Sequence, residues 1–278
     1  MTSSQRLIRR SKIAAVVILF LSLVGIGAYF ALRTPPSCTD GRKNGGETGV
    51  DCGGSCGACP EVLAPEALVI REASVVPGNS ASESDAVFKI YNPNDTIGAS
   101  SVSYDVIFRD TGGSEIGRVS GVDSVLPQET KIVLAIGAAV SGKAVSADIV
   151  FRDAKWQRFS GYQERPRLSV YRTRFETVTS GAFYGQAIGT LRNESPYDFR
   201  TVTVKVVLRD SSGKPLSVNQ TDLNTLLSGD VRDITLPWPS AFPGTVASVE
   251  AVADTDFYHQ ENFIGRYRDA SQEFQSLR

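Results

Sequence analysis

The sequence predicts a mainly β protein with one N-terminal transmembrane helix, a small disulfide-stapled cysteine-rich module and two tandem antiparallel β-sandwiches. Three observations carry this prediction. An uncharged, apolar run lies near the N-terminus, all four cysteines fall within residues 38–60, and a strand-and-turn pattern occurs twice at a spacing of 100 residues.

The bulk composition is that of a globular protein with balanced charge. The chain has 278 residues, 29 basic and 30 acidic side chains, and a formal net charge of −1. Nucleic-acid binding depends on clustered excess positive charge that displaces counterions, so we expect no nucleic-acid partner. The single histidine limits general-base catalysis and metal ligation, because histidine commonly serves in both.

Residues 13–32 form the predicted transmembrane helix. This run, "IAAVVILFLSLVGIGAYFAL", carries no charge, and twenty residues of helix span roughly 30 Å, the thickness of the bilayer hydrocarbon core. Residues 1–12 hold four basic side chains and no acidic one, whereas Arg33 is followed by eight positions without a basic residue. The positive-inside rule therefore predicts a single span with residues 1–12 cytoplasmic and the C-terminal bulk extracytoplasmic.

A cleaved signal peptide is the alternative for this segment, since it has the same charge order. Its apolar region normally covers about 7 to 15 residues and ends at a small-x-small site. The run here is longer, and the following "YFALRTPPS" has no clean site. We therefore expect an uncleaved anchor.

The cysteine-rich module covers residues 38–60. On the oxidising side of a membrane, cysteines favour disulfides, and a glycine-rich segment with almost no apolar residues needs covalent staples to fold. Zinc held by four thiolates and a redox C-x-x-C are the alternatives. We expect two disulfides, with the pairing left open, among Cys38, Cys52, Cys56 and Cys59.

The same loop carries four hard oxygen ligands spaced three or four residues apart. Glycine-rich loops with carboxylates and an amide are often calcium sites, although aspartate, asparagine and glycine are also ordinary turn formers. Calcium is thus the one cofactor that the sequence suggests. Its candidate ligands are Asp40, Asn44, Glu47 and Asp51.

The pattern C-x-D-G-x-x-N-G-x-E-T-x-V-D-C-G-G-x-C-x-x-C resembles a short cysteine-rich repeat of bacterial cell-surface proteins. The resemblance covers this segment only. It implies an exported, disulfide-bonded surface element and no activity.

An internal repeat follows the module. Residues 102–113, "VSYDVIFRDTGG", match residues 202–213, "VTVKVVLRDSSG", and both alternate apolar and polar residues before an Arg-Asp-glycine turn. Such alternation is typical of a strand with one buried face, and the turn predicts that a second strand folds back. Short strands with turn signals every eight to twelve residues indicate antiparallel β-sandwiches of immunoglobulin-like size. We place them at 66–160 and 165–265, with a polar tail at 266–278.

The repeated unit V-x-V-x-[IV]-x-[FL]-R-D-x-x-G resembles the FxLYD-type extracellular β-sandwich domains of prokaryotes. Such domains are similar to binding or spacer modules, so the resemblance implies no catalytic residue.

Few residues suggest chemistry. His259 is the only histidine, and we expect it on the surface, so the sequence predicts no enzyme. Arg172 and Arg174 would share one face of a strand and could meet anionic glycans or lipid headgroups, unless they belong to a solvated linker.

The predicted function is therefore that of a membrane-anchored extracytoplasmic protein, a non-enzymatic binding or spacer module at the cell envelope. Its partners would be the membrane, through a single span, and an unknown protein or glycan ligand. The alternative is a structural subunit of an envelope membrane-protein complex, in which the helix itself packs on partners.

Overall fold

The computed structural model describes residues 3–32, 37–59, 63–159, 161–162, 165–179 and 181–265. The chain divides into two compact units, Met1–Val62 and Leu63–Arg278. The predicted polar tail, 266–278, lies outside the described residues.

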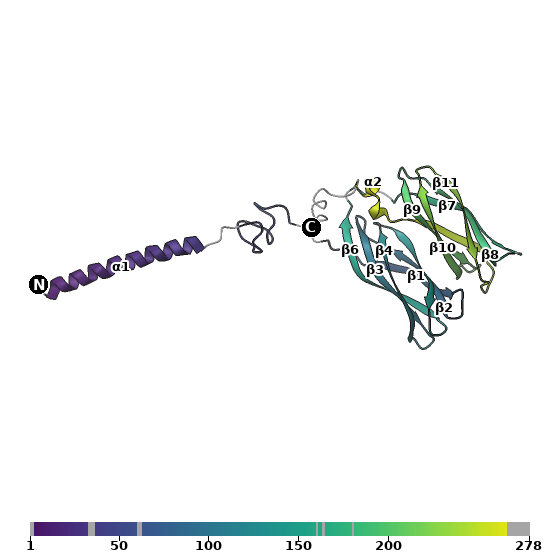
Figure 1. Ribbon diagram of the computed structural model, residues 1–278, viewed down its shortest axis with the longest axis horizontal. Helices are drawn as coiled ribbons and strands as arrows, with labels where there is room; N and C mark the ends of the chain where they lie inside the picture. The colour runs from purple at the N-terminus through teal and green to yellow at the C-terminus, as the bar shows by residue number, and fades with distance from the viewer. Residues whose placement is uncertain are drawn as a thin grey trace. The chain divides into compact units, whose positions relative to one another are not determined.

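The first unit begins with one long helix, α1 (Ser3–Leu32), which includes the whole predicted span (Figure 1). Its segment Lys12–Tyr29 has a mean hydropathy of 2.2, and none of it is buried within the protein. At 1.5 Å per residue, 18 residues extend about 27 Å, which suits a bilayer core. The segment is thus long and apolar enough to serve as a membrane anchor or as a signal sequence.

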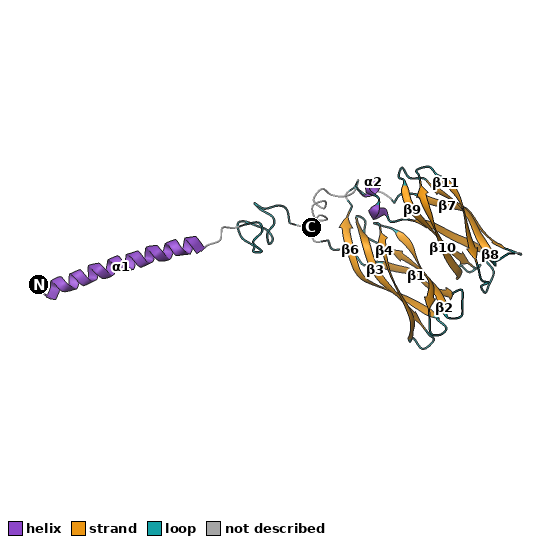
Figure 2. Ribbon diagram, in the orientation of Figure 1, coloured by secondary structure: helices purple, strands orange, loops and turns teal. Residues whose placement is uncertain are grey.

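The second unit is built almost entirely of strands (Figure 2). Its twelve described strands are β1 (Val69–Pro77), β2 (Glu83–Tyr91), β3 (Ile97–Arg109), β4 (Glu115–Val125), β5 (Thr130–Ala139), β6 (Ser146–Arg158), β7 (Leu168–Thr177), β8 (Gly185–Asn193), β9 (Phe199–Arg209), β10 (Pro215–Leu226), β11 (Val231–Trp238) and β12 (Ser248–Asp254). The short helices η1 (Phe257–His259) and α2 (Glu261–Ile264) follow.

The strands form four antiparallel three-stranded sheets, in the orders β1-β2-β5, β4-β3-β6, β11-β8-β7 and β10-β9-β12. The first two sheets make sandwich 1 and the last two make sandwich 2. Each strand of sandwich 1 has its counterpart six places later in sandwich 2, with the same neighbours. The predicted mainly β fold and its duplication are therefore confirmed.

The repeated Arg-Asp-glycine motif is a hairpin turn in both copies. The Asp110 carboxylate accepts backbone N–H groups from the residues two and four positions later, at 2.8 and 2.9 Å. Asp210 does the same at 2.8 and 3.0 Å. Gly113 and Gly213 have φ values of +80° and +84°, a conformation that glycine adopts without strain. The motif thus encodes the turn itself.

A buried asparagine marks a second shared turn. The side-chain amide of Asn92 donates to the carbonyls of Ile97 and Leu126 at 2.8 and 2.9 Å. Asn193 occupies the equivalent place and donates to the carbonyl of Tyr197 at 2.6 Å. Both asparagines are fully buried, so these bonds satisfy carbonyls that water cannot reach.

Strands β3 and β9 are each buried on both faces near the end of the predicted alternation. Val106 and Phe108 of β3 lie in the core of sandwich 1, but Asp105 and Ile107 on the opposite face are also only 5% and 7% exposed. In β9, Lys205 and Val207 are likewise only 7% and 0% exposed. The prediction of one buried face is therefore wrong for both strands. The second face of β9 packs against sandwich 1, whereas Asp105 of β3 is paired with arginines of β4 and β6.

Candidate functional site: the contact and cleft between the two sandwiches

An apolar layer joins the sandwiches. Val87 and Ile132 of sheet β1-β2-β5 form one buried cluster with Val207 and Val218 of sheet β10-β9-β12. Leu134 of β5 packs against the same cluster. Burying such side chains favours association, at roughly 25 cal/mol per Å² of apolar surface removed from water. Sheet β1-β2-β5 of sandwich 1 thus covers sheet β10-β9-β12 of sandwich 2.

The apolar face of sandwich 1 has no counterpart in sandwich 2. Ile132 and Leu134 pair with β2 at the positions where Asp233 and Thr235 pair with β8. Asp233 and Thr235 are exposed, and Asp233 accepts a hydrogen bond from Thr190. Only one of the two equivalent sheets is therefore built for docking.

Ion pairs lie at one border of the apolar layer. Arg209 donates from both terminal nitrogens to the two carboxylate oxygens of Glu72, at 2.8 and 2.9 Å, across the contact. Lys89 lies 2.7 Å from Glu250, again joining the two sandwiches. Burial alone raises the pKa of Glu250, but Lys89 and Arg209 outweigh it and hold this pKa below its usual value.

A second, deeper group of four charges crosses the contact. Lys131 Nζ lies 2.7 Å from Asp123 Oδ1 and 3.0 Å from Asp254 Oδ2. Lys205 Nζ lies 3.0 Å from the same Asp254 oxygen and donates to the carbonyl of Ile132 at 2.8 Å. The side chains of Lys131, Lys205 and Asp254 are at most 9% exposed. We call these four side chains the charge quartet.

Within the quartet, pairing outweighs burial. Burial alone would lower the pKa of Lys131, yet Asp254 and Asp123 raise it above its usual value. Burial alone would likewise raise the pKa of Asp254, yet Lys131 and Lys205 hold it well below its usual range. Lys131 and Asp254 are therefore both charged at neutral pH.

Arg165 and Glu129 extend the contact into the segment that joins the sandwiches. Arg165 Nη1 lies 3.0 Å from Glu129 Oε1, and Arg165 Nη2 donates to the carbonyl of Ala253 at 2.7 Å. Glu129 Oε2 accepts from the backbone N–H of Leu126 at 2.7 Å. Burial raises the pKa of Glu129, and Arg165 opposes the rise. Arg165 is thus engaged inside the contact between the sandwiches.

The segment after β12 binds back onto sandwich 1. The Tyr258 hydroxyl donates to the carbonyl of Val125 at 2.9 Å, and its ring meets Phe159 edge to face at 5.5 Å. Gly98 makes room for this contact, since a Cβ there would lie 2.2 Å from the Tyr258 hydroxyl oxygen. A third element therefore ties the two sandwiches together.

A polar cleft of about 440 Å³ opens beside the charge quartet, between the two sandwiches. Its walls come from β3, β4 and β5 on one side and from β9, β10 and the end of β12 on the other. Its lining includes Ser101, Tyr104, Val122, Lys131, Lys205, Gln220 and Asp254.

The single histidine lies at the mouth of this cleft. As predicted, its side chain is exposed, at 83%, and Nδ1 is hydrogen-bonded to the Asp256 carboxylate. The neighbouring hydroxyls are engaged elsewhere: Thr203 donates to Asp222 at 2.6 Å, and Thr255 donates to the carbonyl of Thr201 at 2.7 Å. Neither of these two threonine hydroxyls therefore donates to His259.

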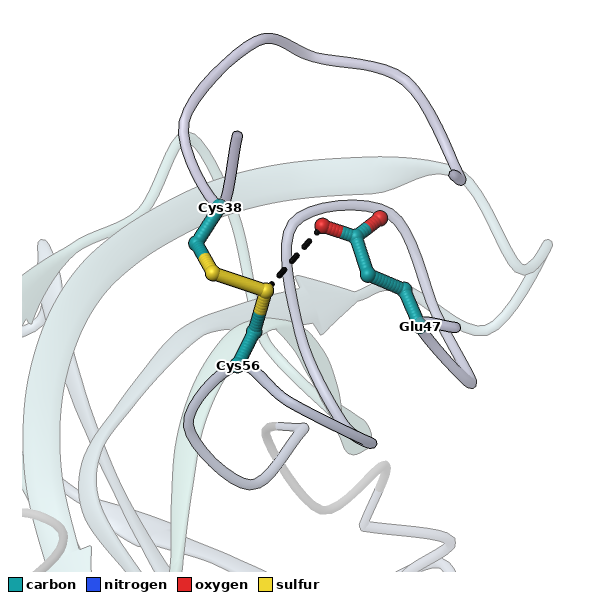
Figure 3. Close-up of side chains that lie close together, drawn as sticks. All are labelled: Cys38, Glu47 and Cys56. Atoms are coloured by element: carbon teal, nitrogen blue, oxygen red, sulfur yellow. Dashed lines mark hydrogen bonds between the residues drawn. A yellow bond between two sulfur atoms is a disulfide. The ribbon is translucent and has the colours of Figure 1, made fainter. Parts of the chain in front are cut away.

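The four cysteines form two disulfides, as predicted. The pairs are Cys38–Cys56 and Cys52–Cys59. Figure 3 shows the first pair beside Glu47, whose Oε1 lies 3.3 Å from Cys56 Sγ. Because both sulfurs are in the disulfide, they are not available as thiolate ligands, and the zinc and redox alternatives do not describe this state.

The calcium candidates lie in the same module, but they bind backbone amides. Asp51 accepts from the N–H groups of Asp40 and Gly41 at 2.9 Å, and Asp40 accepts from the Asn44 side chain at 2.8 Å. Glu47 Oε2 accepts from the N–H groups of Asn44 and Asp51, both at 3.1 Å. These bonds are those of a turn network, so calcium binding stays a prediction.

The two predicted anion-binding arginines lie on β7 and are exposed. Arg174 Nε donates to Glu176 at 2.6 Å, which neutralises it in part. Arg172 has a φ of +54°, within a register shift of β7 against β8, and its guanidinium lies 5.8 Å from the Tyr171 ring centroid. Their role as an anion site also stays a prediction.

The comparisons with known proteins add little beyond the fold. No family model and no curated protein matches the chain. Among solved structures, red sea bream transglutaminase is similar at 12% identity and a TM-score of 0.21. The match covers 69% of this chain and 30% of the transglutaminase chain. It is a distant likeness between β-sandwich regions.

Proposed function

We propose that the chain is a membrane-anchored extracytoplasmic protein that acts as a non-enzymatic binding or spacer module at the cell envelope. The observation that carries the proposal is the contact between the sandwiches. Its apolar layer, the charge quartet and the Tyr258 contact hold two domains as one body, which is what a spacer or a rigid binding platform needs.

The anchor and the location rest on the first unit. An apolar helix followed by two disulfides is typical of a protein outside the reducing cytoplasm. The resemblance of residues 38–59 to a cysteine-rich surface repeat, and of the sandwiches to FxLYD-type domains, supports the same role. In this proposal α1 stays uncleaved, with its N-terminus in the cytoplasm.

Topology is tested with the full chain carrying an epitope tag at each end. In carbonate-washed membranes we expect one species with both tags, and protease added to the outside of spheroplasts should remove the C-terminal tag only. Loss of the N-terminal tag from the mature protein would show signal cleavage and contradict the anchor. Protection of the C-terminal tag in intact spheroplasts would contradict the orientation.

The non-enzymatic part of the proposal is supported by the engagement of the charge quartet and of the Thr203 and Thr255 hydroxyls. The quartet is paired internally, the hydroxyls near His259 donate elsewhere, and all four cysteines are in disulfides. The test is a screen for hydrolytic and acyl-transfer activity with the wild type and His259→Ala. An activity that the substitution abolishes would overturn this part.

A structural subunit of a membrane complex is the second candidate, and one observation favours it. The described side chains of α1 are exposed, and Gly25 and Gly27 have no atom within 4 Å of an added Cβ. Such a bare, small-residue surface permits close approach of another helix. Exchange of α1 for an unrelated transmembrane helix should leave a spacer functional and should release a complex subunit from its partners.

A further inference from the structure

The charged side chains of the cleft are already satisfied by one another. The charge quartet contains two ammonium groups and two carboxylates within 2.7 to 3.8 Å. Lys131 also donates to the carbonyl of Ser124 at 2.7 Å. An ionic ligand would have to compete with these pairs, whose four charges cancel, and Asp256, which also lines the cleft, is hydrogen-bonded to His259.

Three neutral polar side chains of the cleft are uncommitted. Within the described part of the chain, the side chains of Ser101, Tyr104 and Gln220 make no hydrogen bond, although each lines the cleft. Together they offer two hydroxyls and one primary amide, which can both donate and accept. Neutral groups of this kind recognise a ligand that is itself neutral and rich in hydrogen-bonding groups.

Tyr104 is held in place and stays protonated. Its ring packs on β4 at Gly121, where a Cβ would lie 2.4 Å from the hydroxyl oxygen. Burial, with Asp123 nearby, raises the pKa of Tyr104 to about 12. The phenol is therefore a fixed neutral donor and acceptor at physiological pH.

The cleft also has an apolar part. Val122, which is 67% exposed, and Leu134 line it beside the polar groups. A volume of about 440 Å³ lies within the range of roughly 300 to 1,000 Å³ common for small-molecule sites. A lining that combines hydroxyls with aliphatic C–H groups matches the two kinds of surface that a sugar ring presents.

We propose that this cleft binds a neutral saccharide unit through Tyr104, Ser101 and Gln220, with Val122 against the C–H face of the sugar. The inference rests on the binding role proposed above and specifies the ligand class. The site uses residues of both sandwiches, so it exists only when the two are joined.

The test is saturation-transfer difference NMR on the full chain in phospholipid nanodiscs, which contain no sugar headgroups. The probes are three neutral disaccharides: maltose, cellobiose and the N-acetylglucosamine disaccharide. The de-N-acetylated, cationic form of the last and glucuronic acid serve as charged comparisons. We expect saturation transfer to at least one neutral disaccharide and weaker transfer to the charged probes.

Variants assign any binding to the cleft. Tyr104→Phe removes one hydroxyl that has no partner in the protein, so the fold should be unaffected, and affinity should fall about 2- to 10-fold, the value of one hydrogen bond. Gln220→Ala should act similarly. Tyr184→Phe is the matched control, since Tyr184 lies in the aromatic cluster of Phe175 and Phe242, away from the cleft.

The proposal is overturned if no neutral disaccharide binds, if the charged probes bind equally well, or if Tyr104→Phe and Gln220→Ala leave the affinity unchanged. Failure here is distinguishable from failure of the proposed anchored role, because the topology experiment does not depend on any sugar.

Discussion

Lys205 of β9 donates a hydrogen bond to the carbonyl of Ile132 in β5, 2.8 Å away and on the other sandwich. The same ammonium lies 3.0 Å from Asp254 of its own sandwich. One buried side chain thus satisfies a backbone group of one domain and a carboxylate of the other. Removing the Lys205 ammonium should therefore weaken the contact between the two sandwiches while each sandwich still folds.

We predict that Lys205→Met destabilises the protein by about 3 kcal/mol, because Asp254 loses one of its two buried cations. The double variant Lys205→Met, Asp254→Leu should recover much of this loss, since it removes both charges. Lys155→Met, at an exposed position of β6, is the control. Urea unfolding at pH 7 measures the free energies of unfolding. Equal stability of Lys205→Met and the control would contradict the role assigned to the quartet.

The buried carboxyl of Asp85 predicts that the stability of the protein falls as the pH rises. Its residue is 3% exposed, and burial raises the pKa of its carboxyl to about 6, although Gly137 N–H donates to it at 2.7 Å. A carboxyl whose folded pKa is raised binds its proton more tightly in the folded state. Its contribution to stability is therefore full below about pH 4 and is lost as the pH rises through about 6.

Asp85→Asn should consequently raise stability at pH 7 by about 1 to 3 kcal/mol, after allowance for partial solvent screening, and should leave stability at pH 4 nearly unchanged. The asparagine oxygen can still accept from Gly137. Asp153→Asn, at an exposed position of β6, is the control. Unfolding curves from pH 4 to 8 provide the measurement, and parallel pH profiles for wild type and Asp85→Asn would refute it.

Gly98→Ala tests the return of the chain onto sandwich 1. The added methyl group would meet the Tyr258 hydroxyl and the Val125 carbonyl, at 2.2 and 2.9 Å, so the contact must open. We expect a loss of about 1 to 3 kcal/mol and faster amide exchange in 257–264. Gly142→Ala, where no atom lies within 4 Å, should be neutral. Unchanged exchange in 257–264 would show that this segment is held by other contacts.

The disulfides should stabilise the first unit alone. Cys38 and Cys56 are 18 residues apart, so replacing both by alanine should destabilise residues 37–59 by about 3 kcal/mol. The sandwiches belong to a separate unit with its own core, so their unfolding transition should stay unchanged. Differential scanning calorimetry with proteolysis mapping can follow both. A shift in the sandwich transition would reveal a dependence on the module.

Local patterns in the sequence predicted most of the architecture. The strands at residues 102–109 and 202–209, and the Asp-glycine turns after them, depend on neighbours in the chain, and the structure has the strands and the hairpins in both copies. The disulfides of the cysteine module were predicted from its composition and its compartment. Such features are encoded in short stretches of the chain, which a single sequence can report.

The candidate site could not be predicted in this way. Lys131, Lys205 and Asp254 are ordinary strand residues in the sequence. They meet only because one sheet of sandwich 1 covers one sheet of sandwich 2. The signal that could have revealed this was Val207 and Val252, apolar residues at positions that a solvated face leaves polar. The burial of these side chains depends on contacts between distant parts of the chain, which local alternation does not report.

Sheet β1-β2-β5 of sandwich 1 has an apolar docking face, and its equivalent in sandwich 2, sheet β11-β8-β7, does not. This difference has a consequence for assembly. Two copies that both carried an apolar sheet on one side and its acceptor on the other would stack head to tail without end. Sandwich 2 has Asp233 and Thr235 where sandwich 1 has Ile132 and Leu134, and sandwich 1 has Arg118 where sandwich 2 has Val218. Each outward sheet thus carries a polar or charged side chain at these positions, where the docked sheets are apolar, which disfavours the stacking of further sandwiches at either end of the two-domain array.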